Sequence, residues 1–219
     1  MLDLSRERRP IIIAGIAVIL VLFGFLFFRS SGTVETDPAL ARIEKLERKK
    51  DVPGLTQAVN DPDPRVACRA LAGLGRVAGP SASATMGQAM TDSRPIVRQT
   101  AVLVAGDYGM HDLLGQAVDV LKNDHSPLVR SAAAKCLGKL DDWDGVEPLI
   151  AAMNDDDRFV RVAASRSAQE ILGFRFNYSP EAPSAMREAQ IAQIKKRLPA
   201  AKKMFDQYKS HPPKELKSP

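Results

Sequence analysis

Four side chains with reactive groups lie close together in the stretch NDHSPLVRSAAAKCLGKL, residues 123–140: Asp124, His125, Ser126 and Cys136. A serine or cysteine beside a histidine and a carboxylate could form a nucleophile with its general base. Such a site needs a third group that orients the base, and no residue of the sequence is placed to do so. We therefore predict no catalytic residues.

Metal and cofactor sites are equally poorly supported. The histidines His111, His125 and His211 are scattered and lack paired ligand spacing, which argues against zinc. The acidic turns NDPDP and NDDDR lack the glycine and the distal glutamate of an EF-hand loop. We therefore expect neither a metal nor a cofactor, and helix-start carboxylates explain these aspartates better.

The stretch 123–140 is one of four copies of a pattern. Its valine recurs as Val66, Val97, Val129 and Val160, at spacings of 31, 32 and 31 residues. Five residues before each valine stands an aspartate, and four residues after it an alanine: Asp61, Asp92, Asp124 and Asp155, then Ala70, Ala101, Ala133 and Ala164. Arginine follows the valine in three copies, and glycine follows nine residues later in three: Arg98, Arg130 and Arg161, then Gly75, Gly106 and Gly138.

Each copy predicts a helix, a short aspartate-containing turn and a second helix. Aspartate suits a helix start because its carboxylate accepts free backbone N–H groups, and proline is tolerated in the first turn. At 100° per residue, Val129, Ala133, Cys136 and Leu140 share one face of the second helix, which we expect to be buried. Asp124 and Arg130 are then expected to form turn-to-helix hydrogen bonds that link successive units.

The pattern D-x-x-P-x-V-R-x-x-A-A-x-x-L-G resembles the short HEAT-like repeats first associated with phycobilin lyase subunits. The resemblance covers about residues 51–173, divided near 51–79, 80–110, 111–142 and 143–173, and it implies a right-handed α-solenoid. It also implies protein–protein interaction, with the second helices lining a concave face. The candidate partner-binding residues on that face are Gln99, Leu103, Ser131, Lys135, Val162 and Arg166.

Residues 11–28, IIIAGIAVILVLFGFLFF, form an uninterrupted apolar run. As a helix this run would be about 27 Å long, which matches the hydrocarbon thickness of a bilayer. A cleaved signal peptide is the alternative, but its apolar region is usually only about 7–15 residues long. We predict a single-pass anchor after a short N-terminal segment (1–10). Arg6, Arg8 and Arg9 before it favour repeats outside the cytoplasm.

The flanking segments are expected to cap the repeats. A linker (29–37) leads to a capping helix (38–50), and residues 174–209 form a cap followed by a basic amphipathic helix, which Pro199 is expected to interrupt. Trp143, between the third and fourth units, is expected to plug the stack. Residues 210–219 are expected to be disordered.

The net charge is +5, but residues 51–173 carry 12 basic and 16 acidic side chains, against 10 and 4 in residues 174–219. An acidic repeat region argues against nucleic acid as a partner of the repeats. The candidate basic patch is Lys195, Lys196, Arg197, Lys202 and Lys203, which could contact anionic lipid or an acidic partner.

The sequence thus predicts an all-α chain, in which one transmembrane helix precedes a solenoid of four helical-hairpin repeats. The predicted function is that of a membrane-tethered, non-catalytic scaffold for a protein partner that the sequence does not identify. Two alternatives stay open: a subunit of a lyase-type enzyme, and binding of nucleic acid or anionic membrane through the basic C-terminal region.

Overall fold

The computed structural model describes residues 37–210, and all regular elements in that part of the chain are helices. The chain divides into two units between Ala41 and Arg42, and nearly all described residues belong to the second unit. Several predicted segments lie wholly or mostly outside the described residues: the N-terminal segment 1–10, the membrane span 11–28, the linker 29–37 and the tail 210–219. Among the described helices, none is long and apolar enough to cross a membrane.

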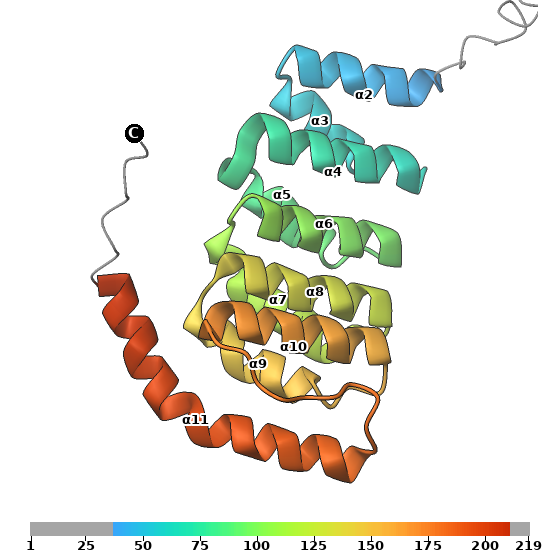
Figure 1. Ribbon diagram of the computed structural model, residues 1–219. Coiled ribbons are helices and arrows are strands. Elements are labelled where there is room, and N and C mark those ends of the chain that lie inside the picture. The colour runs from blue at the N-terminus through green and yellow to red at the C-terminus, as the bar shows by residue number, and fades with distance from the viewer. Residues whose placement is uncertain (1–36, 211–219) are drawn as a thin grey trace, which may run out of the picture. The chain divides into compact units, whose positions relative to one another are not determined.

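Four helical hairpins make up most of the second unit. They are α3 (Val52–Ala58) with α4 (Pro64–Ala78), α5 (Ser83–Ala89) with α6 (Pro95–Asp107), α7 (Leu114–Asn123) with α8 (Pro127–Leu140), and α9 (Val146–Ala152) with α10 (Arg158–Leu172). The second helices α4, α6, α8 and α10 pack side by side in one layer, in front of the first helices in Figure 1. The predicted all-helical fold of hairpin repeats is confirmed.

The connections between hairpins are short. Single turns of 3-10 helix precede α5, α7 and α9: η1 (Gly79–Ala82), η2 (His111–Leu113) and η3 (Trp143–Gly145).

The predicted buried face of α8 is also confirmed, since Val129, Ala133, Cys136 and Leu140 are each at most 1% exposed.

The repeated aspartates shape the turn inside each hairpin. Each one accepts a hydrogen bond at its Oδ1 from the backbone N–H two residues later, at 2.8–2.9 Å; they are Asp61, Asp92, Asp124 and Asp155. This local bond fixes the turn before the second helix begins. In α4, α6 and α8 the second helix begins with proline, whose missing N–H would have no partner there.

The repeated arginines connect one hairpin to the next, as predicted. Arg98 donates from Nη1 to the Asp92 carbonyl at 2.8 Å, and from Nε and Nη2 to the Asp124 carboxylate at 2.7 and 2.9 Å. Arg130 repeats the arrangement with the Asp124 carbonyl and the Asp155 carboxylate. Each guanidinium therefore closes its own turn and holds the next one.

The two ends of this ladder differ. In the last hairpin Arg161 still binds the Asp155 carbonyl at 2.8 Å, but its Nε donates to the Pro180 carbonyl at 2.8 Å, because the element that follows α10 among the described residues is the helix α11 and not another hairpin. In the first hairpin Ala67 stands where the others have arginine. The first turn therefore needs a guanidinium from elsewhere.

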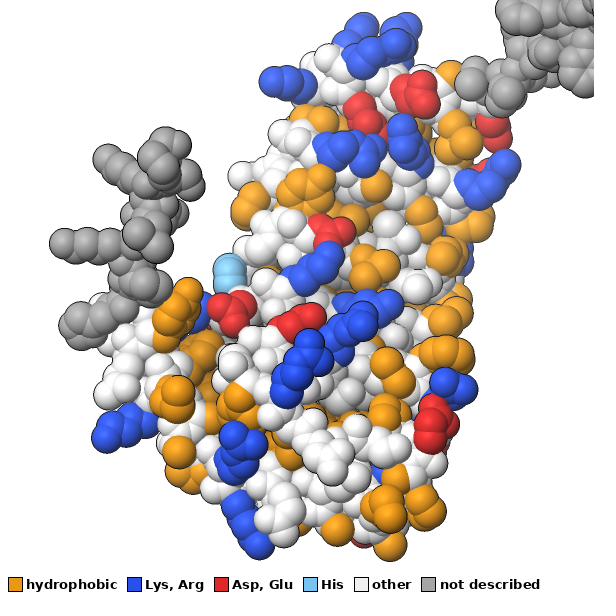
Figure 2. Space-filling view, viewed as in Figure 1, with side chains coloured by type: hydrophobic (Ala, Val, Ile, Leu, Met, Phe, Trp, Pro, Cys, Tyr) orange, Lys and Arg blue, Asp and Glu red, His pale blue; other side chains and the backbone are white. Residues whose placement is uncertain are grey.

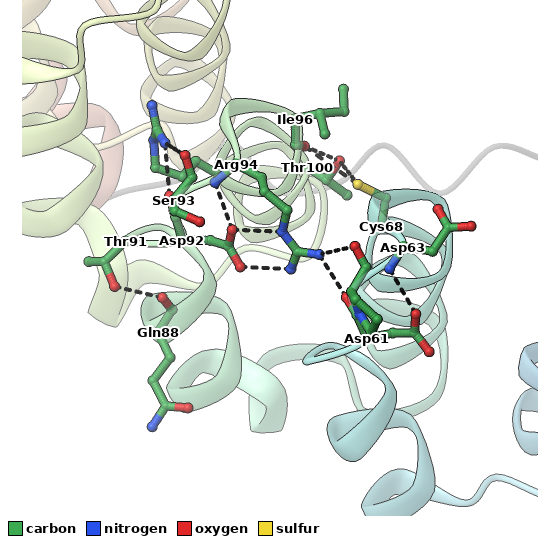
Figure 3. A network of polar contacts seen from close by, with 12 residues as sticks. Asp61, Asp63, Cys68, Gln88, Thr91, Asp92, Ser93, Arg94, Ile96 and Thr100 are labelled. Carbon is green, nitrogen blue, oxygen red and sulfur yellow. Dashed lines mark hydrogen bonds and ion pairs between the residues drawn. The ribbon is translucent and has the colours of Figure 1, made fainter.

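Arg94 reaches back across the first interface (Figure 3). Its Nη1 donates to the Asp61 carbonyl at 2.7 Å, while Nε and Nη2 donate to the Asp92 carboxylate at 2.9 Å each. These are the same kinds of acceptor that Arg98 uses one hairpin later. The guanidinium is thus supplied by the neighbouring turn instead of by the helix that lacks it.

The repeated glycines lie where neighbouring second helices approach most closely. A Cβ added at Gly106 would stand 2.8 Å from the Cα of Cys136, and one at Gly138 would stand 2.5 Å from the Oγ of Ser167. Real Cβ atoms do not approach backbone atoms that closely, so only glycine permits this spacing of α6 and α8.

Helices α2 (Pro38–Arg48) and α11 (Ser184–Ser210) flank the hairpins. Within the second unit, Ile43 of α2 is fully buried and Glu47 forms an ion pair with Arg76 at 2.7 Å. Residues 173–183 lead irregularly to α11, which bends visibly in Figure 1 and contains Pro199. We expected this proline to interrupt the helix, but the helix is continuous and only bent, as happens when proline removes one backbone hydrogen bond.

Candidate functional site: a groove on the second helices

Five of the six candidate partner-binding residues line one groove of about 450 Å³, which crosses α6, α8 and α10. They are Leu103, Ser131, Lys135, Val162 and Arg166; we call this depression the second-helix groove. Gln99 lies one turn before Leu103 and is not among its lining residues. Ser131 is only 8% exposed, so it forms part of the floor.

The most exposed apolar residues of this face were not among the predicted ones. Leu128 and Phe159, which also line the groove, are 63% and 62% exposed, and Ile96 at the equivalent position of α6 is 51% exposed. Each directly precedes the repeated valine. At 100° per residue, that position falls on the same side of the helix as the positions two and six residues after the valine, from which the candidate residues were taken. The helical periodicity of the sequence could therefore have identified these three residues as well.

The apolar and basic residues of this face are adjacent. In Figure 2, Lys and Arg side chains gather over the middle of α8 and α10, beside hydrophobic side chains. Ordinary monomers rarely expose large contiguous apolar patches, so three exposed apolar side chains on three successive hairpins are typical of an interaction surface.

Most of the charged residues on this face are paired. Lys139 forms an ion pair with Asp107, while Arg69 and Arg76 of α4 pair with Glu47. Lys135 and Arg166 form no ion pair or hydrogen bond among residues 37–210, and neither does Glu170. The groove therefore carries two unpaired cations and one unpaired anion.

Two further depressions adjoin the groove. One of about 600 Å³ shares Val162, Arg166 and Glu170 with it and extends to Phe174 and Arg175. The other, also about 600 Å³, shares Glu170 and lies between the end of α10 and the second half of α11, where Met204 and Tyr208 line it. Together they continue the groove towards the C-terminal helix.

Two of the five residues of the candidate basic patch are engaged in contacts within the protein. Arg197 lies over the Phe174 ring at 4.0 Å, and Lys202 pairs with Asp206 at 2.6 Å and lies 5.4 Å from the Trp143 ring centre. Lys195, Lys196 and Lys203 are exposed and have no ion pair in the described part of the chain. Three of the five cations are therefore available to an acidic partner.

Asp124 and Cys136, two of the side chains with reactive groups, have structural roles. Asp124 accepts hydrogen bonds from Arg98 and from the Ser126 N–H, and Cys136 is buried, which raises the pKa of its thiol to about 12. A thiol with that pKa is not ionised near neutral pH. Within residues 37–210 no three His, Cys, Asp or Glu side chains are grouped so that they could hold a metal ion.

Cys68 is the second cysteine of the chain. It is half-buried at the joint between α4 and α6, where it accepts a hydrogen bond from the Thr100 hydroxyl at 3.2 Å (Figure 3). Both cysteines are free thiols.

Comparison with known proteins is consistent with this repeat architecture. A family profile described as HEAT repeats matches residues 52–125 and 114–192. A search of curated proteins gave no match. Nineteen chains of solved structures match. Among them is human deoxyhypusine hydroxylase in complex with glycerol, at 21% identity and a TM-score of 0.52. The match covers 57% of this chain and 44% of the hydroxylase, and at that identity it shows the fold alone.

Proposed function

Because the chain belongs to the HEAT-repeat family, we propose that it is a non-catalytic scaffold that binds a protein partner in the second-helix groove. The observation that carries this proposal is the convergence of Leu103, Val162 and the exposed Leu128 and Phe159 in one depression. Exposed apolar side chains grouped with charged residues in one depression are a usual composition of a protein-binding surface.

The proposal includes a membrane tether at residues 11–28. Its support is the length and the uninterrupted apolar character of that run in the sequence. The same proposal has the repeats outside the cytoplasm, on the basis of the arginines that precede the run. Resistance of the full chain to alkaline carbonate extraction, lost on deletion of 11–28, tests the tether. Reporters active on only one side of the membrane, fused to the C-terminus, test the orientation.

The enzyme alternative is supported less well. The hydroxylase that shares the fold is an enzyme by its name, but a shared fold carries no activity to this chain. A lyase-type subunit would need polar side chains converging from several hairpins, whereas the polar residues of the groove come from α8 and α10 alone and α6 contributes only Leu103.

Differential co-purification from the source cells tests the binding role. The full chain is compared with the double variant Leu128→Glu, Phe159→Glu and with Met186→Glu, a control at an exposed position of α11 outside the groove. We expect one or more proteins to copurify with the wild type and the control, and to be depleted at least tenfold with the groove variant. Equal recovery with all three chains would refute the proposal.

A further inference from the structure

We infer that the second-helix groove binds an acidic, apolar segment of its partner. Apolar side chains of that segment contact Leu128, Phe159 and Val162, and carboxylates contact Lys135 and Arg166. This inference rests on the proposed function and specifies the chemistry of the partner.

The apolar part of the inference follows from the repeat geometry. Leu128 on α8 and Phe159 on α10 occupy equivalent positions of adjacent hairpins, and Val162 lies one turn after Phe159. Adjacent packed helices lie about 8–10 Å apart. An extended segment with three residues per turn rises about 9.3 Å over three residues, so apolar residues three positions apart would each meet one hairpin.

The acidic part follows from which charges lack partners. Lys139 is neutralised by Asp107. Lys135, Arg166 and, in the adjoining depression, Arg175 have no ion pair among the described residues, and Glu170 is the one unpaired carboxylate beside them. Beside exposed apolar side chains, excess positive charge favours a partner that supplies carboxylates, which arginine can bind through two parallel hydrogen bonds.

A phosphate backbone fits this surface less well. Nucleic-acid grooves need cations along their whole length and gain nothing from exposed aliphatic side chains. Here Leu103, Leu128 and Val162 line the groove together with the cations, and Glu170 would repel phosphate.

Selection of random twelve-residue peptides displayed on phage, with the full chain in detergent as bait, tests the inference. Three variants are selected in parallel. Leu128→Glu with Phe159→Glu removes the two most exposed apolar side chains of the groove. Lys135→Glu with Arg166→Glu reverses the charge of the groove. Lys196→Glu with Lys203→Glu makes the same charge change on exposed lysines of α11 that have no partner among residues 37–210. All these side chains are exposed, so the variants should fold, and circular dichroism checks that they do.

We expect the wild type and the α11 variant to enrich peptides that carry Asp or Glu beside Leu, Ile, Phe or Met. The charge-reversed groove should instead enrich Lys and Arg beside the same apolar residues, and synthetic acidic peptides should bind it at least tenfold more weakly. The Leu128→Glu, Phe159→Glu variant should enrich neither class.

Two kinds of result would refute the inference. The first would refute only the acidic character of the partner, and the second would also refute the proposed protein-binding function. Groove-dependent peptides without carboxylates, or a consensus unchanged by the charge reversal, would refute the acidic partner but leave the groove as a protein-binding site. Peptides that bind all variants equally, or tight binding of a single-stranded oligonucleotide in place of peptides, would refute the proposed function as well.

Discussion

Arg94 performs for the first hairpin what Arg98 and Arg130 do for the later ones, but from the opposite side of the interface. Hydrogen bonds to charged groups stabilise a fold by about 1.5–3 kcal/mol. We therefore expect Arg94→Ala to lower the free energy of unfolding by about 2 kcal/mol in urea titrations. Ala67→Arg, which restores the repeat pattern, should recover most of this loss in the Arg94→Ala background. Failure of the second substitution to recover any stability would contradict the compensation.

Gly106 is required by the contact between α6 and α8, since an added Cβ would lie 2.8 Å from the Cα of Cys136. Overpacking of this kind typically costs about 1–3 kcal/mol. We expect Gly106→Ala to destabilise the protein by that amount. The control is Gly115→Ala in α7, where an added Cβ meets nothing within 4 Å. That change should raise stability by up to about 1 kcal/mol, because alanine favours a helix. Equal effects of the two substitutions in thermal unfolding would contradict this interpretation.

Asp124 makes the ladder sensitive to acid. Its burial alone would raise the pKa, but hydrogen bonds from Arg98 and the Ser126 N–H hold the pKa of the carboxyl below its ordinary value. The unfolded chain therefore takes up the proton first, at a pKa of about 3.9. The stabilisation by this carboxylate is complete above that pH, and it is lost as the pH falls through the lower pKa of the folded state.

The corresponding measurement compares the wild type with Asp124→Asn by urea unfolding at several pH values. We expect the wild type to be more stable by about 1–3 kcal/mol near pH 7, since the variant leaves Arg98 without its charged partner. The difference should shrink steadily below about pH 4. A difference that stays constant down to about pH 2.5 would show that the charge of Asp124 contributes nothing.

The second half of α11 is held by few contacts. The Phe205 ring lies 5.5 Å from that of Trp143, and Lys209 pairs with Asp141 at 2.9 Å. Trp143 is the only tryptophan of the chain, so its fluorescence reports directly on this contact. Aromatic pairs contribute about 0.5–1.5 kcal/mol beyond their buried area.

We expect Phe205→Ala to shift the Trp143 emission to longer wavelength in the native state, with far-ultraviolet circular dichroism almost unchanged. In the wild type, the fluorescence transition in urea should precede the circular dichroism transition, because the helix half should detach before the hairpins unfold. Coincident transitions would show that α11 and the hairpins form one cooperative unit. Lys203→Ala, at an exposed position of the same helix half that has no ion pair among residues 37–210, is the control.

The hairpins and their aspartate turns were predictable because each copy repeats the same local chemistry in register. Arg98 and Arg130 belong to that pattern, and so their hydrogen bonds could be expected. The hydrogen bonds of Arg94 could not be expected, since its role depends on Ala67 in another hairpin and on the distance across the interface between the two hairpins. The continuity of α11 through Pro199 was also missed, because a local rule for proline does not include the packing of Ile194 and Ala201 on either side of it.

The candidate site was predictable in part. Helical periodicity alone selected five residues that line the groove, but it did not distinguish the half-exposed Leu103 from the buried Ser131. Leu128 and Phe159 were overlooked although the same wheel contains them. The unpaired state of Lys135 and Arg166 depends on contacts between hairpins, which a single sequence does not reveal.

Taken as one molecule, the proposed scaffold combines a tether at residues 11–28 with a groove formed by the last three hairpins. A tethered partner site works through local concentration: confinement near a membrane raises the effective concentration of the groove for partners in the same compartment. A chain that lacks 11–28 should therefore keep its affinity for groove-binding peptides in solution and lose its partner in cells. Reduced affinity of the shortened chain in solution would show that the run contributes to the groove itself.

The central claim is that the second-helix groove is occupied by a protein in the cell. A photo-crosslinking amino acid placed at Leu128 of the full chain, and at Met186 in a separate control strain, tests it most directly. We predict discrete crosslinked protein bands from position 128, which disappear when Lys135→Glu and Arg166→Glu are introduced, and none of these bands from position 186. Identical crosslinks from both positions, or no crosslinked protein from position 128, would contradict the central claim. Bands from position 128 that persist after the charge reversal would contradict only the acidic character of the partner.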